Sequence, residues 1–145
     1  MKLSEYKKGE AFRGKVPKDQ AHKMALLWGE GSLELTELIE YCINNNIVTS
    51  ASCRGHIDEN GADAYIMFGS MPKEFVEHMV SVIEENKELN AKMDVSRFGD
   101  HKPEFGIHAN SVQKRIDEDS SHLFKTILEG VQAYKMKEDR RKTIR

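Results

Sequence analysis

The sequence has few cysteines and no long apolar segment, and each absence excludes a class of protein. Its two cysteines, Cys42 and Cys53, are too few for the disulfide framework of a small secreted domain. No apolar run is long enough to span a bilayer, and the first residues lack the apolar core of a signal peptide. We therefore predict a cytoplasmic protein with reduced thiols and no membrane partner.

The chain also lacks a dominant charge. Its 22 basic and 24 acidic residues leave a net charge of −2, so no overall field draws it onto nucleic acid or an anionic membrane. A length of 145 residues with 39% hydrophobic content predicts one folded domain over 1–145, without repeats or a linker. Residues 1–16 are predicted to form an arm or short strand, and the basic tail 140–145 a frayed, solvated end.

The spacing of apolar residues predicts four helices and four strands. Period-3.6 spacing and end signals place helices at about 17–28, 33–43, 72–86 and 117–139. Alternation and β-branched residues place strands at about 47–52, 91–96 and 105–109, and a short apolar run places one at 64–68. The order α-α-β-β-α-β-β-α predicts an α+β fold, with an antiparallel sheet of about four strands and helices mainly on one face. The inner face of the first helix is predicted to hold Ala21, Met24, Ala25, Leu27 and Trp28.

The segment 49–56, Thr-Ser-Ala-Ser-Cys-Arg-Gly-His, is the candidate functional site. It gathers a thiol, a guanidinium, a glycine and an imidazole where a purely structural turn would use Asn, Asp, Pro or Gly. Gly55 permits positive φ or the close approach of a ligand. Because a turn exposes its side chains, Cys53 is expected to react with thiol reagents, whereas Cys42 is expected to be buried in a helix face.

Three kinds of chemistry fit these residues. Cys53 and His56 have metal-ligand spacing and, with His101 and His108, form a candidate zinc set. A second ligand pair, such as Cys-x-x-Cys, is absent, and we assign no metal. Cys53 with His56 or His108 is a candidate nucleophile and base, although no oxyanion element is recognisable. The third kind, anion binding by Arg54 and the backbone at Gly55, requires the least geometry.

Aromatic and other histidine side chains favour structural interpretations. Tyr65 and Phe68 lie on a predicted strand, where packing into the core is favoured over stacking on RNA bases. Core packing is likewise favoured for Trp28. The remaining helix histidines are expected on the surface: His22, His78 and His122.

Two motifs resemble a known family. Residues 50–56, Ser-Ala-Ser-Cys-Arg-Gly-His, are similar to the Ser-Ser-Cys-Ser-Gly-Arg motif of the third-step methyltransferases of tRNA wybutosine synthesis. Residues 103–109, Pro-Glu-Phe-Gly-Ile-His-Ala, are similar to that family's Pro-Phe-x-Leu-His-Val strand, which also precedes a long helix. The resemblance covers roughly residues 35–135. His56, Arg54 and Ala51 depart from the family pattern, and the family's later glycine- and arginine-bearing segment is absent.

The resemblance implies a pocket for S-adenosylmethionine or a modified guanosine of tRNA, bordered by Ser52, Cys53, Gly55 and His108. The first functional hypothesis is therefore a methyltransferase with Cys53, His56 and His108 as catalytic residues. The second is a non-catalytic module that binds a small anion or nucleotide through Ser50, Ser52, Arg54 and Gly55. The third is an interaction protein that uses the last helix and its basic tail. RNA as a partner and a homo-oligomer remain open alternatives.

Overall fold

A computed structural model describes residues 16–54, 64–69, 71–96, 104–109 and 116–144. These residues form a four-stranded antiparallel sheet with the strand order β1-β2-β4-β3. The strands are β1 (Thr49–Cys53), β2 (Ala64–Phe68), β3 (Ala91–Ser96) and β4 (Glu104–Ala109). The predicted α+β class and element order are confirmed. The strands form two β-hairpins, β1–β2 and β3–β4, which are joined through β2 and β4.

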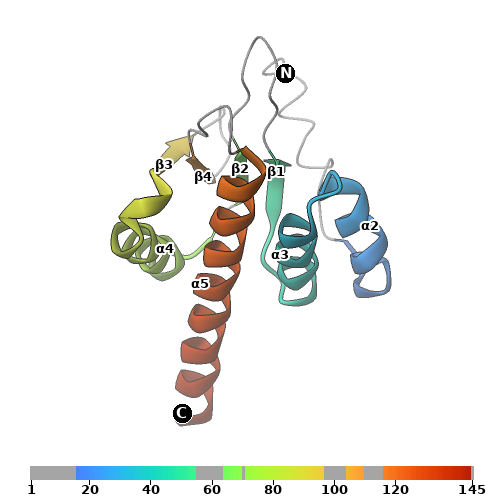
Figure 1. The fold of residues 1–145 in the computed structure, drawn as a ribbon. Helices are drawn as coiled ribbons and strands as arrows, with labels where there is room; N and C mark the ends of the chain where they lie inside the picture. Colours follow the sequence, from blue (N-terminus) through green and yellow to red (C-terminus); the bar gives the residue numbers. More distant parts are fainter. Residues whose placement is uncertain (1–15, 55–63, 70, 97–103, 110–115, 145) are drawn as a thin grey trace.

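The helices are α2 (Ala21–Trp28), α3 (Leu33–Asn44), α4 (Lys73–Glu85) and α5 (Ile116–Ile144). Short 3-10 helices precede α2 (η1, Lys18–Gln20) and β3 (η2, Lys87–Leu89). Figure 1 shows α3, α4 and α5 gathered along the sheet, with α2 at the outer end beyond α3. Within the described residues, no helix is long and apolar enough to cross a membrane.

Alternation along the strands divides the sheet into two faces. Ala64, Ile66 and Phe68 of β2 and Ile107 of β4 are fully buried and belong to the core that the helices cover. Tyr65 and Met67 alternate with them on the other face and are only partly buried. Core packing is thus confirmed for Phe68. It is wrong for Tyr65, because the two residues are three positions apart on one strand and therefore lie on opposite faces of the sheet.

Among the described strands, β1 stands first in the sheet order, and its pairing with β2 is irregular. Its register with β2 shifts between Thr49 and Ala51, which marks a β-bulge at Ser50. Beyond the shift, Ser52 pairs with Ile66 and Cys53 pairs with Tyr65. Ser52 therefore faces the helices, and Cys53 lies on the other face of the sheet.

Helix α2 packs on α3 through small residues. Ala21 and Ala25 are buried, whereas Leu26 and Leu27 are 55% and 67% exposed. Gly29, just past the end of α2, lies so close to α3 that a Cβ there would meet the Thr36 hydroxyl and approach the Thr36 Cα to 3.0 Å. The prediction that Leu27 faces inward is therefore wrong, because Ala21 and Ala25, one turn apart, face α3, whereas Leu27, two positions after Ala25, lies on another side of the helix. Trp28 is partly buried against the core, as expected.

Helix α5 is longer than predicted. Leu123, Phe124, Ile127 and Val131 are fully buried in the core, whereas the last turns extend past the other elements (Figure 1). Glu138 joins two turns there, since its carboxylate accepts hydrogen bonds from Lys135 and Lys142 at 3.1 and 3.3 Å. These bonds lower the pKa of Glu138. The predicted frayed tail is therefore wrong for residues 140–144, which continue the helix.

Candidate functional site

The C-terminal end of β1 meets the turn between α2 and α3, and this junction contains two of the predicted ligand-binding residues. Ser52 donates a hydrogen bond from its hydroxyl to the Trp28 carbonyl, with an oxygen–oxygen distance of 3.3 Å. This bond ties the strand to the end of α2. Ser52 therefore helps to hold β1 against the end of α2. Its hydroxyl proton is used in this hydrogen bond to the backbone.

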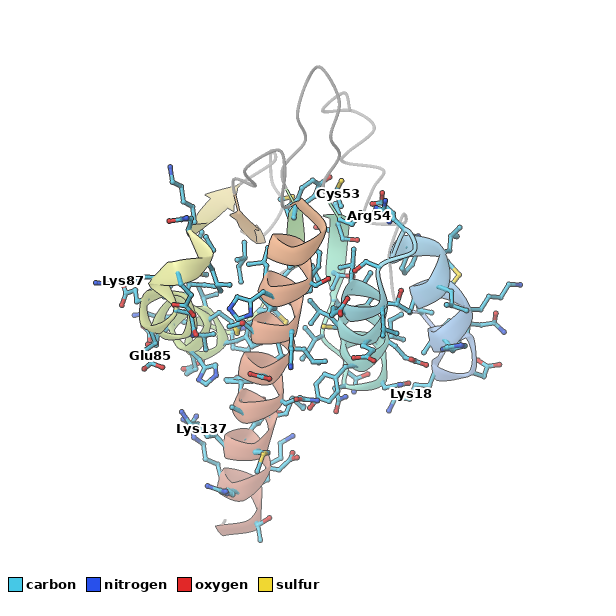
Figure 2. The ribbon with its side chains drawn as sticks, in the orientation of Figure 1. Lys18, Cys53, Arg54, Glu85, Lys87 and Lys137 are labelled. Carbon is cyan, nitrogen blue, oxygen red and sulfur yellow. The ribbon has the colours of Figure 1, made fainter. Side chains whose placement is uncertain are left out.

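Arg54 extends from the junction toward the turn. A Cβ built on Gly31 would lie 3.6 Å from the Arg54 Nη1 atom, so the guanidinium lies directly beside the glycine. Arg54 is partly buried, and Figure 2 shows it above the ends of α2 and α3. The planar, always charged guanidinium of Arg54 thus lies beside the backbone of this turn.

The turn itself has an unusual backbone. Glu30 and Gly31 have φ values of 52° and 84°, in succession. Glycine adopts positive φ freely, but a residue with a Cβ adopts it uncommonly, and such positions concentrate at functional sites. Ser32 then caps α3, because its side chain accepts a hydrogen bond from the Leu35 amide at 3.2 Å. The positive end of the α3 dipole therefore lies at the same turn as Arg54.

Cys53 lies within β1 rather than on the turn that follows it. The side chain is only 7% exposed, although it is outside the main core cluster. The expectation of an accessible Cys53 thiol is therefore wrong, because the strand extends one residue further than predicted and pairs Cys53 with Tyr65. Cys42 is fully buried as predicted, and burial raises its pKa strongly. Both cysteines are thiols.

Alkylation of the native protein should consequently label neither cysteine quickly. We expect Cys53 to react far more slowly than an unfolded cysteine, and Cys42 to react only after global unfolding. Mass spectrometry after brief exposure to iodoacetamide, with and without denaturant, measures both rates. Rapid native labelling of Cys53 would contradict its placement in β1.

The remaining predicted site residues are only partly placed. Ser50 is partly buried in β1 at the register shift. His108 pairs with Tyr65 on one side and Lys92 on the other, so the backbone brings it onto the same cross-strand row as Cys53, two strands away. Gly55, His56 and His101 lie outside the described residues. Within the described part of the chain no three His, Cys, Asp or Glu side chains form a metal-binding group, and the predicted zinc set falls largely outside that part.

His78 is predicted on the surface, but the structure places it in a partly buried environment. It is partly buried between α4 and α5, where its Nε2 lies 2.8 Å from the Gly130 carbonyl and its ring lies 5.7 Å from that of Tyr134. The surface prediction is right for His22 and His122, which are exposed and lie beside Glu40 and Glu88. The bond of His78 joins residues 52 positions apart, and no local pattern indicates it.

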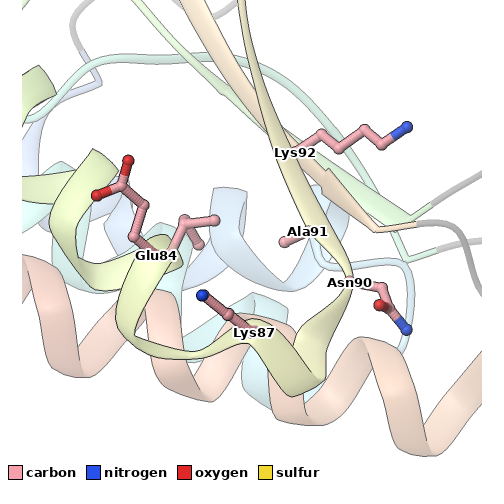
Figure 3. Close-up of a pocket in the computed structure, with 6 residues that line it drawn as sticks. Glu84, Lys87, Asn90, Ala91 and Lys92 are labelled. Atoms are coloured by element: carbon pink, nitrogen blue, oxygen red, sulfur yellow. The ribbon is translucent and has the colours of Figure 1, made fainter.

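In the described part of the chain, clefts also lie away from the β1 junction. One of about 460 Å³ runs between α4 and α5 above His78 and Tyr134, with Glu74, Glu77 and Arg141 among its lining. Another, of about 570 Å³, lies where η2 turns into β3 (Figure 3). Its lining includes Glu84, Lys87 and Lys92, whose mixed charges select no single class of ligand.

Comparisons with known proteins identify no relative of this chain. No family model matches the sequence, and neither the curated proteins nor the solved structures contain a significant match. The methyltransferase resemblance therefore rests on the two sequence motifs alone.

Proposed function

We propose that the protein binds a small anionic ligand, such as a nucleoside phosphate, at the junction between β1 and the α2–α3 turn. The observation that carries the proposal is the position of the Arg54 guanidinium directly beside Gly31. An arginine offers a phosphate or carboxylate two parallel hydrogen bonds. The amino end of α3 adds a favourable dipole.

The junction supports binding better than thiol catalysis. Cys53 has little exposed surface for a substrate to reach, and the Ser52 hydroxyl donates to the Trp28 carbonyl. A methyl transfer from S-adenosylmethionine remains a proposal that rests on the motifs, and it requires that cofactor to bind. The same binding experiment therefore separates the two functions.

Removing the Arg54 guanidinium should weaken anion binding. Loss of a charge-assisted hydrogen bond costs about 1.5–3 kcal/mol, so Arg54→Ala should lower the affinity roughly tenfold or more. Arg54→Lys should restore only part of it, because an ammonium cannot form the two-point contact. Titration calorimetry with pyrophosphate, ADP and S-adenosylmethionine measures these differences.

Arg140→Ala is the matched control, since it removes the same charge from an exposed position on α5. It should leave every affinity unchanged. If the unmodified protein binds none of the three probes, the proposal is wrong. Binding of S-adenosylmethionine alone, insensitive to Arg54→Ala, would favour the methyltransferase function at another site.

A further inference from the structure

The cleft of about 460 Å³ between α4 and α5 has one acidic wall and one basic wall. Among the described residues that line it, α4 contributes the carboxylates Glu74, Glu77 and Glu85, and α5 contributes the cations Lys137 and Arg141. Both sets repeat at helical spacing, so each lies on one face of its helix. Figure 2 shows Lys137 extending from α5 on the side where α4 lies. The two kinds of charge are thus sorted by helix.

Two contacts hold α4 against α5 beside this cleft. A Cβ built on Gly130 of α5 would lie 3.0 Å from a Val82 methyl carbon of α4, so the helices touch at this glycine. The His78 Nε2 lies 2.8 Å from the Gly130 carbonyl oxygen. Because a carbonyl only accepts, this ring nitrogen donates the hydrogen bond. His78 and Val82 both line the cleft, so these contacts fix the positions of its walls.

Tyr134 lies between the charges of the two walls. Its ring is buried against Phe75 at a centroid distance of 5.0 Å. Burial raises the pKa of Tyr134, as do the nearby carboxylates of Glu138 and Glu74, whereas the Arg141 guanidinium lowers it. A carboxylate from the acidic wall and a guanidinium from the basic wall therefore both act on this hydroxyl.

The walls face each other without a direct ion pair. Among the described residues no salt bridge crosses the cleft, and Glu77 pairs with Lys73 of its own helix at 3.6 Å. Glu74 and Arg141 have no salt bridge within this part of the chain. Separated charges of opposite sign are complementary to a ligand that carries both.

We infer that this cleft binds a short peptide with free ends, with the ammonium group at Glu74 and the carboxylate at Lys137 and Arg141. Arginine recognises a carboxylate through two parallel hydrogen bonds. The axes of packed helices lie about 8–10 Å apart. An extended peptide of two or three residues spans about 7–11 Å, so its ends can reach both walls. This site is separate from the anion-binding junction at Arg54.

Titration of the isotope-labelled full chain with trialanine, followed by NMR chemical shifts, tests the inference. N-acetyl-trialanine lacks the ammonium group, and trialanine amide lacks the carboxylate. Each should bind about tenfold or more weakly than trialanine, because one charge-assisted hydrogen bond is lost. Free alanine should also bind about tenfold or more weakly, since it is too short to reach both walls.

Two variants assign the ends of the peptide to the two walls. Arg141→Gln should weaken binding of trialanine and of its N-acetyl form several-fold, and leave the amide unchanged. Glu74→Gln should weaken binding of trialanine and of the amide several-fold, and leave the N-acetyl form unchanged. Arg140→Gln and Glu84→Gln are the matched controls, because they remove the same charges from exposed positions outside this cleft. Neither should change any affinity.

A protein that does not bind trialanine at about ten millimolar would overturn the inference. Equal affinity for the blocked peptides or for alanine would do so too, as would binding that tolerates both Arg141→Gln and Glu74→Gln. Circular dichroism shows whether each variant is folded, and the blocked peptides test the same charges on the unmodified protein. Arg54→Ala should leave trialanine binding unchanged, so failure here is distinct from failure of the anion-binding proposal.

Discussion

Phe75→Ala should lower the free energy of unfolding by about 4 kcal/mol, since truncation of a buried phenylalanine typically costs 3–5 kcal/mol. Phe75 is fully buried, and its ring meets Phe68 of β2 edge-on at a centroid distance of 5.4 Å and Tyr134 of α5 at 5.0 Å. One side chain thus joins the sheet to two helices. The variant leaves a cavity and removes both aromatic pairs.

Urea denaturation followed by circular dichroism measures this loss. Val76→Ala, at the next and only partly buried position of α4, is the control and should cost about 1 kcal/mol. Equal midpoints for the two variants would show that Phe75 does not link the three elements. Tyr134→Phe should separate the ring contact from the hydroxyl, since it keeps the ring.

The second large effect is expected at Gly29. Its φ of −77° is open to any residue, so the effect of Gly29→Ala comes from space alone. The added methyl would meet the Thr36 hydroxyl and lie 2.8 Å from the Ala25 carbonyl oxygen and 3.0 Å from the Thr36 Cα. Two of these three neighbours are backbone or Cα atoms that cannot rotate away. We expect a loss of about 2 kcal/mol or more, as overpacked sites show.

A double variant tests the cause of that loss. Thr36→Ala removes the hydroxyl that the new methyl would meet, so Gly29→Ala should be less damaging in that background. The backbone contacts remain, and recovery should therefore be partial. Thermal unfolding of the two single variants and the double variant gives the coupling energy. Additive effects would contradict close packing of Gly29 on Thr36.

Much of the fold could be predicted because its signals are local. The short apolar run at 64–68 and the helical spacing of apolar residues at 75–83 each lie within one element, and both elements formed where expected. The inner face of α2 could not be predicted in this way. Ala21, Ala25 and Trp28 repeat at helical spacing, but Leu26 and Leu27 place apolar residues on other sides of the same helix. In the structure the side with the alanines faces α3, and Gly29 lies close to Thr36.

The sequence indicated which segment contains the candidate site, but not what each of its residues does there. The cluster around Arg54 indicated the C-terminal end of β1, where we propose the binding site. The exposure of Cys53 could not be predicted, because it depends on where the strand ends and which residue pairs with it. Gly31 carried no signal of its own, because its partner is 23 residues away. Spatial proximity between separate elements is the information that local patterns lack.

The β-bulge in β1 has a consequence for solubility. A regular edge strand offers a row of unsatisfied backbone groups on which strands of other molecules can add, and this leads to aggregation. The shift between Thr49 and Ala51 interrupts the regular ladder in the middle of a five-residue strand. Addition of further strands along β1 is thereby disfavoured, although Val48, just before the strand, is an exposed apolar side chain.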